Sequence, residues 1–223
     1  MVKKLFSFAG RLLMLNAIAV LLAVFIMLPI ISNWNNAVFG WIITILFSLV
    51  MLGLVWVDAV NSGTKDTKND KITRNILEDN TTAEKDKPRL VYRKWFGFAG
   101  GALAQAMAYA FIATLAYILY ATHALDGFFA ENSLAAIMTT GLKLWNMTYL
   151  NAFMTFEKAT PALFMIFFLL FTSAAGLGYL NGPVQQQRLE TIIERNKARK
   201  AKRVQDDLKN KKRSQPKKPG ARN

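Results

Sequence analysis

The stretch LLMLNAIAVLLAVFIMLPIIS, from Leu12 to Ser32, is 21 residues long and contains no charged side chain. A helix needs about 20 consecutive apolar residues to cross the ~30 Å hydrocarbon core of a bilayer. The stretch follows Lys3, Lys4 and Arg11, as the apolar region of a secretory signal peptide would, but such a region has only ~7–15 residues. No small-residue cleavage site follows it. We therefore expect a retained membrane-spanning helix.

Three further apolar runs resemble the first one. They cover Ala37–Val57, Trp95–Thr122 and Pro161–Gly182, and none contains Asp, Glu, Lys, Arg or His. The four runs predict an all-α integral membrane protein with transmembrane helices at about 12–32, 37–57, 96–122 and 161–182.

A fifth apolar segment, Leu134–Phe156, carries polar residues on one side. Its apolar residues recur every three or four positions, at Leu134, Ile137, Met138, Leu142, Trp145, Tyr149, Ala152, Phe153 and Phe156. This spacing is typical of an amphipathic helix. Placing Lys143 near the bilayer centre would cost ~2.5–3.5 kcal/mol. We therefore expect an interfacial helix at 134–156, with a re-entrant segment as the alternative.

Two hydrophilic segments carry most of the charge. Residues 58–94 contain nine Lys or Arg and seven Asp or Glu, so we expect a solvated cytoplasmic loop with some helical character. Residues 183–223 contain fourteen basic and four acidic residues, which predicts a basic cytoplasmic helix followed by a disordered tail. The chain thus divides into a transmembrane domain, 1–182, and a basic region, 183–223.

The basic residues predict the orientation, because Lys and Arg near membrane spans are kept on the cytoplasmic side. Three precede the first run, nine lie in 58–94 and fourteen lie in 183–223, whereas only Lys143 and Lys158 lie between the third and fourth runs. Four crossings with both termini in the cytoplasm satisfy this distribution. We expect the cell membrane as the location.

The basic tail is the main source of the net charge of +14. Beside a membrane it meets anionic lipid headgroups first, and each Lys or Arg there contributes about 1 kcal/mol. Contact with ribosomal RNA and contact with a protein partner are the alternatives. The expected contact residues are Arg188, Arg195, Lys197, Arg199, Lys200, Lys202, Arg203, Lys209, Lys211, Lys212 and Arg213.

Small residues recur every three or four positions in the third and fourth runs. Such spacing lets helix backbones approach closely. The predicted packing residues are Gly97, Gly101, Ala104 and Ala108 in the third run, and Ala174, Gly178 and Gly182 in the fourth. We expect these two helices to pack on each other, with a homodimer or another membrane protein partner as the alternative.

Residues suited to catalysis are scarce. The chain has no cysteine and a single histidine, His123, which is followed by Asp126 and Glu131 in what we expect to be an interfacial loop rather than a metal site. No phosphate-binding glycine motif occurs. We predict no catalytic residues, no metal, no cofactor and no enzymatic activity.

Two short motifs carry a resemblance to a group of proteins. DKPRLVYRKWFGFAGG precedes and begins the third run, from Asp86 to Gly101, and GLGYLNG ends the fourth run before the basic tail. In these motifs the chain resembles uncharacterised four-helix membrane proteins of low-GC Gram-positive bacteria, over residues 86–195 at most. The segment before the third run lacks the Asp-Arg-Asn-Leu-Val pattern of that group. The resemblance implies a bacterial membrane location and no assigned activity.

These patterns favour a non-enzymatic accessory, scaffold or regulatory subunit at the membrane. A small transport component or a homo-oligomeric channel is the first alternative. An insertase-like factor whose basic tail binds ribosomes is the second.

The charge distribution makes a direct prediction about topology. Reporter enzymes fused after Asp58, His123 and Asn223 should report cytoplasmic, external and cytoplasmic positions in that order, because 26 of the 28 basic residues would then lie inside. Activity of alkaline phosphatase and of a cytoplasmic reporter at each site gives the measurement. An external signal at Asn223 would contradict the four-crossing arrangement.

Overall fold

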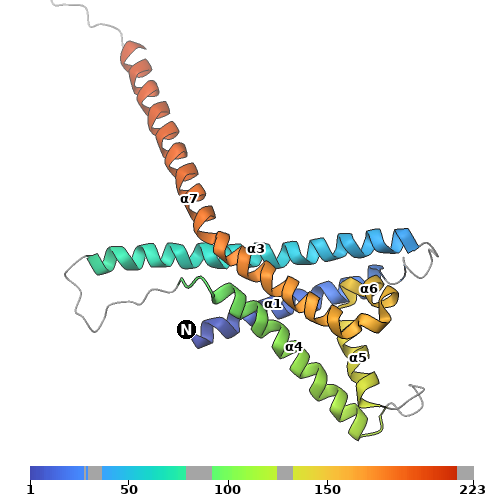
Figure 1. The fold of residues 1–223 in the computed structure, drawn as a ribbon. Helices are drawn as coiled ribbons and strands as arrows, with labels where there is room; N and C mark the ends of the chain where they lie inside the picture. The colour runs from blue at the N-terminus through green and yellow to red at the C-terminus, as the bar shows by residue number, and fades with distance from the viewer. Residues whose placement is uncertain (28, 30–36, 79–91, 125–132, 215–223) are drawn as a thin grey trace, which may run out of the picture. The chain divides into compact units, whose positions relative to one another are not determined.

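The computed structural model describes residues 1–27, 29, 37–78, 92–124 and 133–214, and every regular element among these residues is helical (Figure 1). The elements are α1 (Val2–Leu22), the π-helical turn η1 (Ala23–Met27), α3 (Ala37–Glu78), α4 (Phe96–Ala121), α5 (Leu134–Trp145), the 3-10 turn η3 (Met147–Tyr149), α6 (Leu150–Thr155), the 3-10 turn η4 (Glu157–Ala159) and α7 (Thr160–Ser214). The chain divides into two units, Met1–Pro183 and Val184–Asn223.

Four of the described helices are long and apolar enough to cross a membrane. They contain the apolar windows Val2–Ile26, Val38–Asn75, Phe96–Ala121 and Thr160–Asp207. The prediction of an all-α chain with four such helices is therefore confirmed for the described residues.

Two predicted boundaries are wrong. The first helix begins at Val2, ten residues before the predicted start, and α3 continues to Glu78 through the first 21 residues of the predicted loop 58–94. Neither extension contains proline, and each buries one face: Phe8 and Ala9 in α1, Asp66 and Asp70 in α3. The many charged residues after Asp58 favoured a solvent-exposed loop. The helix continues nevertheless, because one of its faces is buried against neighbouring helices.

The segment 134–156 is broken, which differs from the single helix expected from its spacing. Ser133 caps α5, since its Oγ accepts a hydrogen bond from the Ala136 amide at 3.2 Å. The helix ends at Asn146, whose Nδ2 donates to the Leu142 carbonyl oxygen at 2.9 Å. The Leu142 carbonyl oxygen also accepts the Asn146 amide at 3.1 Å, so the backbone and the side chain of Asn146 both close the last turn of α5. η3 and α6 follow.

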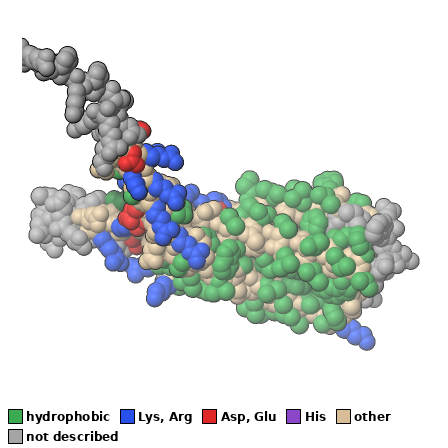
Figure 2. Space-filling model, turned by 90° about the horizontal axis from the view of Figure 1, so that it is seen from above, with side chains coloured by type: hydrophobic (Ala, Val, Ile, Leu, Met, Phe, Trp, Pro, Cys, Tyr) green, Lys and Arg blue, Asp and Glu red, His purple; other side chains and the backbone are tan. Residues whose placement is uncertain are grey.

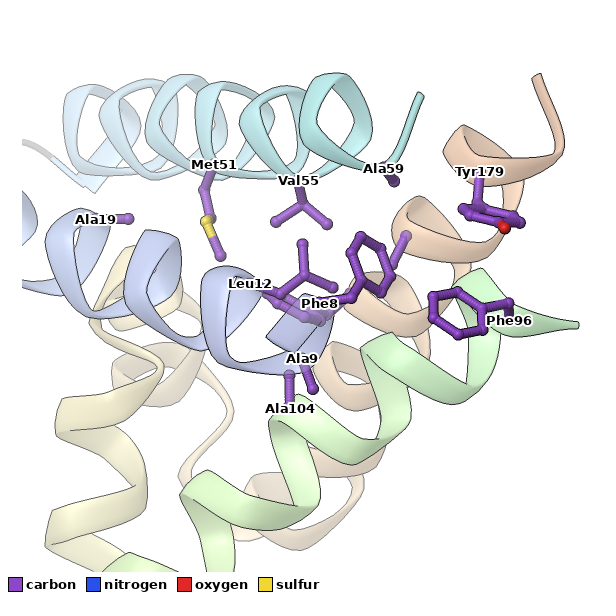
Figure 3. Packing of buried hydrophobic residues seen from close by; sticks show 12 residues of the cluster. Phe8, Ala9, Leu12, Ala19, Met51, Val55, Ala59, Phe96, Ala104 and Tyr179 are labelled. Atoms are coloured by element: carbon purple, nitrogen blue, oxygen red, sulfur yellow. The ribbon is translucent and has the colours of Figure 1, made fainter. Parts of the chain in front are cut away.

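The core of the first unit lies where α1, α3, α4 and α7 meet. Figure 3 shows Met51 and Val55 of α3 pointing toward Leu12 and Phe8 of α1. The cluster consists of Phe8, Ala9, Leu12, Ala19, Met51, Val55, Ala59, Phe96, Ala104, Phe171, Ala175 and Tyr179. A second cluster joins Ala23, Ile43 and Met147, and a third joins Tyr149, Ala152, Phe153 and Phe167. The four long helices and the broken segment therefore form one packed unit.

The outer surface of the first unit carries many exposed apolar side chains. Figure 2 shows hydrophobic side chains covering much of its visible face. Leu49, Val50, Phe111, Met165 and Leu169 are all more than half exposed. Soluble monomers rarely expose contiguous apolar patches larger than a few hundred Å². This surface suits a hydrocarbon environment.

Glycines allow α7 to cross its neighbours at very short range. A Cβ added at Gly63 of α3 would overlap the Tyr179 carbonyl oxygen, and one at Gly182 of α7 would overlap the Gly63 backbone. A Cβ at Gly97 of α4 would lie 2.7 Å from the Ala175 carbonyl oxygen. By contrast, a Cβ at Gly53 would meet nothing within 4 Å.

The substitution Gly63→Ala should therefore destabilise the protein by about 1–3 kcal/mol, because the atom it meets belongs to a backbone that must shift. Gly53→Ala is the matched control on the same helix. It should be neutral or stabilising by up to about 1 kcal/mol, since alanine favours the helix and the site is open. Equilibrium unfolding in mixed detergent micelles measures both. Equal effects of the two variants would show that the close crossing of α3 and α7 is incorrect.

Candidate functional site

A buried carboxylate lies at the end of the first unit where α1 begins. Asp66 of α3 is 3% exposed, forms an ion pair with the Lys4 ammonium of α1, and accepts a hydrogen bond from Tyr179 Oη of α7 at 2.6 Å. A buried charge is costly unless it is paired and hydrogen-bonded. Both needs are met here, so Asp66 links three helices.

A second ionic group lies one to two helical turns away on α3. The Arg11 Nη2 atom donates to Ser62 Oγ at 2.6 Å and lies 3.4 Å from Asp58 Oδ2, within ion-pair distance but without an aligned hydrogen bond. The Arg11 guanidinium also lies 5.7 Å from the centre of the Phe8 ring. α1 and α3 are therefore joined by two separate ion pairs.

The segment that leads into α4 is bound to α3 and α7 near Asp66. Asp70 Oδ2 accepts a hydrogen bond from the Tyr92 amide at 2.9 Å. The Tyr92 ring stacks on the Tyr179 ring, with centroids 5.2 Å apart and planes 5° apart. Burial raises the pKa of the Tyr92 phenol above its ordinary value of about 10.

A small cavity opens beside these groups and has a volume of about 100 Å³. It lies between α1, α3 and the start of α4. Its lining consists of Lys4, Ser7, Phe8, Arg11, Ser62, Lys65, Asp66 and Phe96. Three cations thus face a space that also contains two hydroxyls.

This charged end was not predicted from the sequence, because residues 58–94 were assigned to a loop. A usable signal was present, however. Asp58, Ser62, Asp66 and Asp70 follow one another at intervals of four residues, which places them along one helix face. Gly63 lies beside that face.

The predicted packing residues lie in contacts between several different pairs of helices. Gly97 and Gly101 of α4 lie against Ala175 of α7, whereas Gly178 and Gly182 of α7 lie against α3. Ala104 is buried and faces Ala9 of α1 (Figure 3). Ala108 of α4 is buried beside α5, and Ala174 packs against the core from α7. Among the predicted packing residues, Gly97 and Gly101 make the contact between α4 and α7, which also meet where Gly176 lies against Phe98 and where Tyr109 Oη donates to the Phe164 carbonyl oxygen at 3.4 Å.

The predicted basic contact residues belong to the second unit. Arg188, Arg195, Lys197, Arg199, Lys200, Lys202 and Arg203 are exposed on α7. Lys209, Lys211, Lys212 and Arg213 lie in the last turns of α7, but their side chains are outside the described residues. Apolar residues on the same stretch are exposed as well, with Leu189, Ile192 and Val204 about half exposed.

Polar groups surround the break between α5 and α6. The Thr148 carbonyl oxygen accepts a hydrogen bond from Ser48 Oγ of α3 at 3.1 Å, and Trp145 Nε1 donates to Gln105 Oε1 of α4 at 3.1 Å. Thr148 is 1% exposed. Irregular backbone is tolerated at membrane depth where protein buries it. These hydrogen bonds join the break to α3 and α4, so neighbouring helices bury its irregular backbone.

A larger cavity of about 590 Å³ lies between α1, α4 and α5. Its walls include Leu13, Val20, Phe111, Ile112 and Ile137. Trp145 also lines it, but the indole N–H is already bound to Gln105. This lining suits a hydrocarbon chain better than a polar substrate.

The described residues contain no group of three His, Asp or Glu side chains that could hold a metal ion. His123 is described, with a φ of 53°, but Asp126 and Glu131 lie outside the described residues.

Comparisons of the chain with protein-family models, curated proteins and solved structures found no match. The resemblance to four-helix membrane proteins of Gram-positive bacteria stays a prediction.

The Tyr179–Asp66 hydrogen bond gives a testable prediction. Tyr179→Phe should destabilise the protein by about 1.5–3 kcal/mol, because a hydrogen bond to a charged, buried acceptor is lost. Tyr117→Phe is the matched control, since Tyr117 of α4 is 62% exposed, and it should change stability by less than about 0.5 kcal/mol. Unfolding in mixed micelles gives both values. A Tyr179→Phe variant as stable as the parent would show that the bond contributes nothing.

Proposed function

We propose that the chain is a non-enzymatic multi-pass protein of the bacterial cytoplasmic membrane, which acts as an accessory, scaffold or regulatory subunit. The observation that carries this proposal is the combination of a packed apolar unit with an exposed basic helical segment in one chain. The first unit would anchor the protein, and the second would present a binding surface in the cytoplasm.

The ion pairs of the first unit support the proposed topology. Lys4 and Arg11 precede the first apolar run, whereas Asp58 and Asp66 follow the second. A chain that crosses the membrane twice between these groups returns to the side from which it started. With the positive-inside rule, this supports a cytoplasmic position for the N-terminus and for α3 after Asp58, and the charge of the basic helix supports the same side for it.

The contacts of the broken segment favour the re-entrant alternative for residues 134–156. Phe156 lies near Trp41, close to the start of α3, with ring centroids 6.2 Å apart. The Thr148 carbonyl oxygen binds Ser48, which lies seven residues beyond Trp41, or about 10 Å further along α3. The segment would dip into the bilayer from the outer side and return. Lys143 would lie in the last turn of α5, where the helix dipole favours a cation and the long side chain can extend toward water.

Cysteine labelling of this cysteine-free chain tests the dip. Ser133→Cys and Lys158→Cys should both react with a membrane-impermeant reagent from the outside, and Thr140→Cys should react much more slowly than either. Labelling of Lys158→Cys only from the inside would indicate a full crossing. Equal rates at Thr140→Cys and Ser133→Cys would favour the interfacial helix.

The exposed basic helix suits the anionic surface of the cytoplasmic leaflet. Its cations would supply the attraction, at about 1 kcal/mol each near the surface. Leu189, Ile192, Ile193 and Val204 would enter the headgroup region and fix the rotation of the helix. RNA or a protein partner remains the alternative ligand of this surface.

A peptide of residues 188–213 should bind vesicles containing anionic lipid, become more helical on binding, and dissociate as salt rises. Replacing Arg199, Lys200, Lys202 and Arg203 with Gln should weaken binding by two to three orders of magnitude, because four charges of about 1 kcal/mol each are removed. Replacing the neutral residues Thr191, Asn196, Ala198 and Ala201 with Gln is the control and should change binding less than about threefold. Vesicle co-sedimentation and circular dichroism give the measurements. Binding to ribosomes or duplex RNA without binding to anionic vesicles would replace the lipid with a nucleic acid.

A further inference from the structure

The small cavity beside Lys4 lies where charged residues give way to apolar ones on two helices. Arg11 is the last charged residue of α1 before its apolar run, and Asp58 is the first charged residue of α3 after its run. Arg11 lines the cavity, and Asp58 forms an ion pair with Arg11. In the proposed topology this level coincides with the headgroups of the cytoplasmic leaflet.

The positive charge at the cavity is only partly compensated. Lys4, together with Tyr179, engages Asp66, and Arg11 engages Asp58. Among the residues that the structure describes, no carboxylate lies within ion-pair distance of the Lys65 ammonium. The cavity therefore has one more cation than it has acidic partners.

Hydrogen-bond donors also remain for a ligand. A guanidinium carries five N–H donors in a fixed fork, and the described bonds of Arg11 use Nη2 only. The Ser7 hydroxyl lines the cavity beside them, while the Ser62 hydroxyl already donates to the Asp58 carbonyl oxygen. The Phe8 and Phe96 rings supply apolar walls. Cations, a hydroxyl and an adjacent apolar wall match a phosphate ester that is attached to a hydrocarbon.

We propose that this cavity binds the phosphate group of an anionic phospholipid, with Lys65 and Arg11 as its charged contacts and Ser7 as a hydroxyl donor. A volume of about 100 Å³ admits one phosphate group but not a whole lipid headgroup with its chains. The acyl chains would follow the apolar surface that begins beyond Phe8. The carboxylate of Asp66, which also lines the cavity, is compensated by Lys4 and Tyr179 and so leaves the site open to an anion.

The test uses the full-length chain in a neutral detergent and compares Lys65→Gln with Lys68→Gln. Both residues are exposed on α3, and both substitutions remove one positive charge, but only Lys65 lines the cavity. The ligands are short-chain phosphatidylglycerol, short-chain phosphatidylcholine and inorganic phosphate. Native mass spectrometry gives the affinity of the first bound molecule. The thermal midpoint without ligand reports any disturbance of the fold.

We expect phosphatidylglycerol to bind about five- to tenfold more weakly to Lys65→Gln than to the parent, and the affinity of Lys68→Gln to stay within twofold. Ser7→Glu, which adds a carboxylate at the cavity, should weaken binding at least as much as Lys65→Gln. Phosphatidylcholine should bind more weakly than phosphatidylglycerol to the parent, because its choline cation lies beside the phosphate and is repelled by the cations at the cavity.

Equal losses in Lys65→Gln and Lys68→Gln would overturn the proposal, because binding would then follow net charge alone. Inorganic phosphate that binds the parent as tightly as phosphatidylglycerol would overturn the assignment to a lipid and point to a soluble phosphate compound. The basic helix of the second unit is identical in all variants, and no bilayer is used. The result is therefore separate from the test of topology and from the test of that helix.

Discussion

The burial of the Asp66 carboxylate is the constraint on which the arrangement of the first unit depends. A charge removed from water must find compensation, and Asp66 finds it in Lys4 from α1 and Tyr179 from α7. Neither partner can reach Asp66 unless α1, α3 and α7 meet at one level. A register that separated Asp66 from Lys4 and Tyr179 would leave the charge without these partners, at a cost of several kcal/mol. These two interactions therefore favour the observed register of the three helices.

Close helix crossings make that meeting possible. Gly63 and Gly182 let the backbones of α3 and α7 touch, and Gly97 does the same between α4 and α7. With side chains at these positions, Tyr179 would be displaced from Asp66 and from its stacking partner Tyr92. The polar network and the small residues therefore depend on each other. The glycines set the distance between helices, and the charges set their register.

The sequence predicted the number and type of the long helices well, because an uncharged apolar run of about 20 residues matches the width of a bilayer and exceeds a typical buried core helix. It failed on their ends. Charge in 58–78 indicated solvent, yet Asp66 and Asp70 belong to a buried helix face, and only their four-residue spacing could have revealed it. Small-residue spacing located Gly178 and Gly182 as packing positions, but spacing contains no information about which helix is the partner. The cavity near Lys65 joins residues from three helices, so it could not be predicted without the fold.

The length of α3 has a mechanical consequence. The helix has 42 residues and measures about 63 Å, roughly twice the thickness of the hydrocarbon core. The half from Asp58 to Glu78 continues the apolar half as one helix, and its first turns are held by Lys4 of α1 and Tyr179 of α7 at Asp66 and by the Tyr92 amide at Asp70. A change in the tilt of the apolar half would therefore be passed to α1, to α7 and to the segment that leads into α4.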